Sequence, residues 1–142
     1  MRILAVDPGE ARIGIAISDP TGSLARPLSV IKHVNRLVDA AVIAQIAIEN
    51  DAGQIIIGQS LDMEGAPTPM GRKAARLAEA LRTQTTIPVA LWDEGFSTQE
   101  AQEILLKQGV SRIRRRGHQD DSAAAVILQS YLDAQADLPG AG

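Results

Sequence analysis

The stretch ILAVDPGEARIGIAISD, residues 3–19, decides the fold of this 142-residue chain. Two aliphatic, β-branched runs are separated only by the Pro-Gly punctuation of a tight connection, which predicts an antiparallel pair of strands over 2–7 and 12–19. The first run nevertheless ends on a charged residue, Asp7. A carboxylate at the tip of a buried strand calls for either a turn-forming or a chemical explanation.

The remainder of the chain alternates strand-like and helix-like segments. Pro27 indicates that the third strand lies at an edge of the sheet or begins there. Strands followed by alternating elements predict a three-layer α/β domain, with a mixed five-stranded sheet between helices. The expected elements after the first pair are a strand over 25–33, a helix over 35–50, a strand in QIIIG (54–58), a helix that opens at Thr68-Pro69, a strand in IPVALW (87–92), a helix over 97–109 and a final helix over 120–134.

The composition allows a sizeable core that is built almost without aromatic side chains. Hydrophobic residues make up 45% of the chain, yet there is one Trp, one Tyr and one Phe. The absence of cysteine excludes disulfides and thiolate metal sites. No signal-peptide pattern and no apolar run near the roughly 20 residues that span a bilayer is present. We expect one soluble, cytoplasmic domain over 1–142 with a flexible tail over 136–142; the sequence leaves monomer and homodimer open.

Acidic residues stand at three informative places in the predicted fold. Asp7 ends the first strand, Glu94 follows the last strand after Asp93, and Asp121 begins the last helix after Asp120. If the first and last strands are parallel, two of these carboxylates lie at the same edge of the sheet, and the helix can bring the third. Mg²⁺ or Mn²⁺ would relieve their mutual repulsion, because hard cations take carboxylate oxygens and need neither Cys nor His. Such an ion assists phosphodiester hydrolysis.

Each of these residues also has a purely structural explanation. Asp7 before Pro-Gly can start a turn, Asp120 or Asp121 can cap the last helix, and Glu94 can be a solvated loop residue. Taken singly, the structural explanations are the more common ones.

Basic residues cluster in SRIRRRGH, residues 111–118, which we expect to be a loop before the final helix. Arginine suits bidentate contact with phosphate, so this loop is a candidate for nucleic-acid binding, although charge runs are usually just solvated. His118 is a weaker candidate for positioning water. Arg72, Lys73 and Arg76 would extend a basic surface, but an exposed helix face explains them equally well.

With these residues in hand, the chain resembles the YqgF (RuvX) family over about residues 3–134. DPGEARIGIAISD matches the family's Asp-x-Gly start, with Arg12 and Gly14 in step. PVALWDEGFST resembles its acidic motif of the type Asp-Glu-Arg-Leu-Ser-Thr, and DDSAAAVILQSYL resembles its C-terminal helix of Asp and small residues. Family members are described as pre-16S rRNA processing nucleases and as Holliday-junction-resolvase-like, with an RNase H-like fold.

The resemblance implies roles for individual residues. Carried over by position, it makes Asp7, Glu94 and Asp121 the catalytic and metal-binding carboxylates, with Mg²⁺ or Mn²⁺ as cofactor and pre-rRNA or branched DNA as substrate. Asp120, His118 and Asp62 are auxiliary candidates. The expected contacts to nucleic acid are Arg12, Arg112, Arg114, Arg115 and Arg116.

The chain departs from the family pattern at two places. Gly95 stands where the family usually has Arg, and GQSLD (58–62) replaces the common Gly-Leu-Pro-Leu-Asn. Both differences concern substrate contacts more than the three acids.

Two other classes of protein remain open. One is a nucleotide-binding phosphotransferase of the actin and sugar-kinase type, which normally closes two such domains around ATP. The other is a catalytically silent RNA- or ribosome-binding module.

Overall fold

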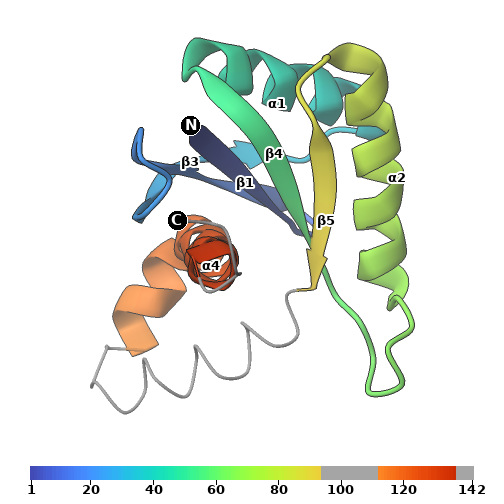
Figure 1. Cartoon of the computed structure of the whole chain (residues 1–142). Coiled ribbons are helices and arrows are strands. Elements are labelled where there is room, and N and C mark those ends of the chain that lie inside the picture. The colour runs from blue at the N-terminus through green and yellow to red at the C-terminus, as the bar shows by residue number, and fades with distance from the viewer. Residues whose placement is uncertain (94–111, 137–142) are drawn as a thin grey trace.

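The computed structural model describes residues 1–93 and 112–136, with side chains in the second segment from residue 123 onward. Five strands form one mixed sheet in the order β3-β2-β1-β4-β5 (Figure 1). The β1–β2 and β2–β3 pairs are antiparallel, whereas β4 runs parallel to both β1 and β5. The strands are β1 (Arg2–Pro8), β2 (Arg12–Ser18), β3 (Ala25–Lys32), β4 (Ala52–Gln59) and β5 (Val89–Asp93).

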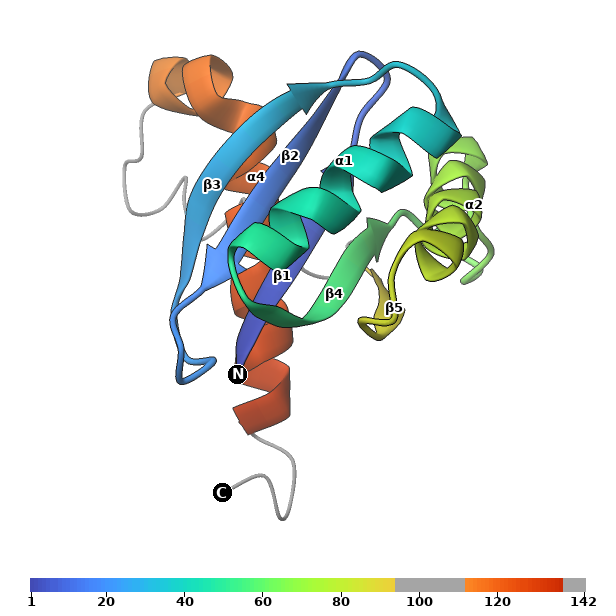
Figure 2. The same ribbon diagram turned by 90° about the horizontal axis from the view of Figure 1, so that it is seen from above.

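Helices cover both faces of this sheet, as the sequence predicts. The helices α1 (Arg36–Glu49) and α2 (Pro69–Gln84) pack on one face, and α4 (Arg112–Ala136) packs on the other (Figure 2). The strands alternate between two cores accordingly. Leu4, Val6 and Ile15 face α1 and α2, while Ile3 and Ala5 face α4. The three-layer α/β architecture is therefore confirmed.

Small residues let α4 approach the sheet closely. Ala5 and Ala16 of the sheet and Ala124 of the helix are all fully buried in the core on this side, together with Ile56 and Leu128. Close packing gains from many short-range contacts rather than from large side chains. The core under α4 is thus built mainly from small and aliphatic side chains, with Trp92 and Tyr131 packed against it.

The helix boundaries follow local signals. The Asn35 side chain accepts a hydrogen bond from the Val38 N–H at 2.9 Å and caps α1, and Thr68 caps α2 by accepting from the Gly71 N–H at 3.1 Å. These are the bonds that orphan N–H groups at a helix start require. After α1 the chain reverses through Asp51, whose φ of 54° is left-handed.

The final helix starts earlier than predicted. The arginine stretch was expected to be a loop, but α4 begins at Arg112 and includes it. Arginine and glutamine favour helix and no proline intervenes, so a single glycine, Gly117, does not stop it. The helix also extends to Ala136, where the tail was expected to start. The predicted helix over 97–109 and residues 137–142 lie outside the described residues.

The third strand is an edge strand, as Pro27 indicated, because β3 pairs only with β2. None of the helices in the described segments is both long enough and apolar enough to cross a membrane.

Candidate active site

Asp7 lies at the edge of the sheet where the parallel strands end. Its neighbour in β2 is Gly14, and the register of Val6 with Ile57 places Gly58 of β4 on its other side. Asp7 is thus flanked in both adjoining strands by residues that carry no side chain. Neither neighbouring strand therefore places a side chain directly beside the half-buried Asp7 carboxylate. The sequence analysis missed this feature, since the pairing that reveals it is not visible in the chain order.

The strand register also places β5 relative to Asp7. Gly58 pairs with Trp92, so Trp92 lies level with Asp7 two strands away, which is roughly 10 Å between backbones. Trp92 packs with the α4 core, whereas Leu91 packs with the opposite core. Alternation along β5 therefore puts Asp93 on the α1–α2 face. Asp7 follows Ile3 and Ala5 in alternation and belongs to the α4 face.

The helix that carries Asp120 and Asp121 packs on that same face. Its buried stripe includes Ala124 and Leu128, and positions 120 and 121 lie about one helical turn before Ala124. α4 runs opposite to β1 (Figure 2), and Gln129 already lies near the start of β3, where its amide contacts Ser23 and Ala25. The N-terminal half of α4 is accordingly the half directed toward the end of the sheet where Asp7 lies.

Trp92 joins β5 to α4 near this edge. Its Nε1–H donates to Ser130 Oγ at 2.9 Å, and its ring meets that of Tyr131 edge-on, with centroids 5.2 Å apart. A buried indole N–H normally has such a partner. Trp92 is therefore a partly buried member of the core under α4.

The other predicted site residues are placed as follows. Arg12 opens β2 beside Lys32 of β3 at the same sheet edge as Asp7. Glu94 and Gly95 lie outside the described residues, as do the side chains of His118, Asp120, Asp121 and the four arginines of α4. Among the side chains that are described, no three His, Asp or Glu residues come together in a group able to hold a metal ion.

Asp62 has a structural role in the loop after β4. Its Oδ1 accepts hydrogen bonds from the backbone N–H groups of Glu64 and Ala66, at 2.9 and 3.0 Å. These bonds stabilise the turn that begins at Asp62, the last residue of GQSLD. Aspartate commonly accepts such bonds in turns.

Asp19, which matches the family pattern, also organises a turn. The Leu24 N–H, the Thr21 hydroxyl and the Ser23 N–H all donate to its carboxylate and hold its pKa well below the ordinary value. Hydrogen bonds to the charged form have this effect. Asp19 closes the β2–β3 connection at the opposite end of the sheet from Asp7, so its role is structural.

Comparison with known proteins identifies relatives over nearly the whole chain. A protein from Thermoanaerobacter pseudethanolicus, named "Putative pre-16S rRNA nuclease", is 43% identical over 136 residues, covering 95% of this chain and 98% of that protein. One from Anaeromyxobacter sp. with the same name is 44% identical over 135 residues, covering 95% and 98%.

Solved structures show the same fold at low identity. Thermus thermophilus RuvC in complex with a Holliday junction has a TM-score of 0.60 at 14% identity and covers 96% of both chains. The fowlpox virus resolvase with its Holliday junction has a TM-score of 0.56 at 16% identity, covering 94% of this chain and 98% of that chain. The fold is thus that of the RNase H-like resolvases. The model of the RuvX family, described as Holliday junction resolvase, matches residues 1–134, and the chain belongs to this family.

Proposed function

We propose that this protein is a divalent-metal-dependent nuclease that hydrolyses phosphodiester bonds in the 5′ region of pre-16S rRNA. The observation that carries the proposal is the position of Asp7. It lies at the carboxyl edge of β1, between two glycine positions, on the face that α4 covers. The names of the relatives support the substrate, and the shared fold supports nucleic-acid chemistry.

The residues near this edge fit a hard cation. Cys is absent from the chain, and Asp7 offers carboxylate oxygens at a position where neither neighbouring strand places a side chain. Mg²⁺ and Mn²⁺ prefer such oxygens. Asp7, Glu94 and Asp121 would hold the ion, which would activate water and stabilise the leaving oxygen. Because Asp93 lies on the other face of the sheet, Glu94 is the better partner for Asp7.

The chain's own residues have separate tasks in this proposal. Asp7 is fixed by two neighbouring strands and gives the site its rigid reference point. Arg12 lies at the same edge and would contact the phosphate backbone, together with the four arginines at the start of α4. Such contacts supply affinity that does not depend on sequence.

The test is cleavage of an RNA that carries the 5′ extension of 16S rRNA, with a four-way DNA junction as second substrate, in Mg²⁺ or Mn²⁺. Asp7→Asn should reduce cleavage at least about 100-fold, because it removes a ligand charge. Asp93→Asn is the matched control at the end of β5, two strands away from β1, and should stay near the parent rate. Mn²⁺ binding followed by electron paramagnetic resonance should fall in Asp7→Asn and not in Asp93→Asn.

The same assay resolves the two adjacent aspartates of α4. We expect Asp121→Asn to abolish cleavage and Asp120→Asn to retain most of it. Cleavage by Asp7→Asn at the parent rate would expose a contaminant. Cutting of the junction alone would make the protein a resolvase, and no cutting of either substrate would leave a silent RNA-binding module.

A further inference from the structure

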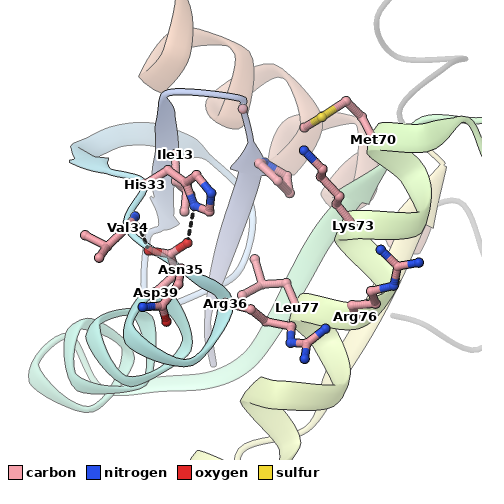
Figure 3. Close-up of a pocket in the computed structure, with 12 residues that line it drawn as sticks. Ile13, His33, Val34, Asn35, Arg36, Asp39, Met70, Lys73, Arg76 and Leu77 are labelled. Carbon is pink, nitrogen blue, oxygen red and sulfur yellow. Dashed lines mark hydrogen bonds and ion pairs between the residues drawn. The ribbon is translucent and has the colours of Figure 1, made fainter.

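A pocket of about 270 Å³ opens on the α1–α2 face, directly across the β1–β2 turn from Asp7. Pro8 and Gly9 form the wall nearest to Asp7. Ile13 and Leu77 are almost completely buried and form an apolar floor. Figure 3 shows Arg36 coming from α1, while Met70, Lys73 and Arg76 come from α2.

Three positively charged side chains stand on the rim of this pocket. Arg36, Lys73 and Arg76 all line it, and none of the three forms an ion pair with any residue that the structure describes. Three cations around one hollow attract an anion, since the surrounding low-dielectric walls focus their field. Arg72, by contrast, lies outside the pocket and donates from Nη1 to the Pro67 carbonyl at 3.2 Å.

Asp39 is the one carboxylate among the lining residues that the structure describes, and it is already hydrogen-bonded. Asp39 is 3% exposed. It accepts hydrogen bonds from the Val34 N–H at 3.0 Å and shares a short contact of 2.5 Å with His33 Nδ1. The buried carboxylate is therefore committed to His33 and not to the three cations. It also fixes the imidazole, whose Nε2 is left to meet a ligand; His33 is 38% exposed.

The apolar floor and the cationic rim together favour a ligand that has both an anionic group and an apolar part. Phosphate suits the guanidinium and ammonium groups, while the partly exposed Met70 offers an apolar surface for a base or sugar. The volume is just below the roughly 300 Å³ at which small-molecule pockets usually start. A single nucleotide unit is therefore the largest ligand that we assign to the pocket itself.

We propose that this pocket binds one nucleotide unit of the polynucleotide substrate, next to the bond that is cut. The inference rests on the proposed function, because the strand must reach the pocket from the site at Asp7. Only the turn at Pro8 and Gly9 separates the two, and alternation along β1 puts Asp7 and Pro8 on opposite faces. A nucleic-acid strand bound at Asp7 has to cross only this turn for its next nucleotide to lie among Arg36, Lys73 and Arg76.

The experiment measures binding without catalysis. A fluorescently labelled RNA of the 16S 5′ region is titrated with the full chain in the Asp7→Asn background, with EDTA present, and anisotropy is recorded at several salt concentrations. Adding Lys73→Ala and Arg76→Ala should weaken binding about tenfold and lower the salt slope by roughly 1.4, the value for two contacts with a single strand. Arg72→Ala, a charge loss on the same helix, should change the affinity less than twofold.

A competition arm separates a strand from a free nucleotide. AMP at millimolar concentration should not displace the RNA, because a single unit lacks the contacts made elsewhere along the strand. Displacement by AMP would overturn the assignment to substrate and make the pocket a mononucleotide site. Circular dichroism melting of each variant confirms that the fold is kept.

Failure of this inference differs from failure of the proposed function. RNA binding within twofold of the parent by the Lys73→Ala, Arg76→Ala variant refutes the pocket assignment, even if the wild-type chain cuts RNA. A chain that cuts nothing, yet loses RNA affinity in this variant, refutes the nuclease and leaves the pocket assignment standing.

Discussion

Truncation of Leu128 to alanine tests how firmly α4 is held on the sheet. Leu128 is fully buried, in a core with Ile3, Ala5 and Ile56. Removing about three carbon atoms at about 0.8 kcal/mol each forfeits about 2.4 kcal/mol of transfer free energy. The cavity adds to this, and buried Leu→Ala changes cost about 2.7–5 kcal/mol. We expect a loss of about 3.5 kcal/mol in the free energy of unfolding.

Urea unfolding followed by tryptophan fluorescence is the appropriate assay. Trp92 is the only tryptophan, and its indole N–H is bonded to Ser130 of α4, so its emission reports on the docking of this helix. With an m-value of about 1.5 kcal/mol/M, the midpoint should fall by about 2 M. The matched control is Leu37→Ala, because Leu37 is 61% exposed on α1; it should change stability by less than about 0.5 kcal/mol.

The refuting result is a Leu128→Ala variant within about 1 kcal/mol of the parent, since a fully buried leucine cannot be removed so cheaply. Such a value would mean that α4 is not packed on the sheet as described. The placement of positions 120 and 121 on the Asp7 face would then lose its basis.

Three further changes have definite expected outcomes. Gly9→Ala brings a Cβ to 2.3 Å from the Arg12 carbonyl oxygen, so the turn must open; we expect about 1–3 kcal/mol lower stability by thermal melting and weaker cleavage. Gly71→Ala places a Cβ 2.1 Å from the Ser60 carbonyl oxygen and should destabilise the start of α2 similarly, seen as an earlier urea midpoint. Asp19→Asn removes a carboxylate whose pKa is lower in the folded chain than the value of 3.8 expected in the unfolded chain. The charged carboxylate therefore stabilises the fold at pH values above 3.8. The gap in stability between parent and variant should therefore be full at pH 6 and shrink as the pH falls below about 4, and a gap independent of pH would contradict the reasoning.

Local signals in the sequence predicted most of the fold. The Pro-Gly connection between the first two strands, the start of α2 at Thr68-Pro69 and the edge position of Pro27 are each decided within a few residues. The start of α4 was predicted wrongly for the same reason. Charge and a glycine suggested a loop, whereas helix propensity without a proline allows the helix to begin at Arg112.

The candidate site was predictable in part. The place of Asp7 at the end of β1 follows from the chain order, but the flanking Gly14 and Gly58 follow from strand pairing across long separations. The pocket depends on α1 and α2 packing side by side, and nothing local joins His33 to Lys73. The convergence of Glu94 and Asp121 on Asp7 stays a prediction.

The edge strand β3 limits how two copies of this protein can meet. Pro27 interrupts its row of hydrogen-bond donors, and Arg26 and Lys32 are exposed along it. Features of this kind keep one sheet from being extended by the next molecule. Pairing of β3 with the same strand of a second copy, the step that would extend the sheet into a fibre, is therefore disfavoured.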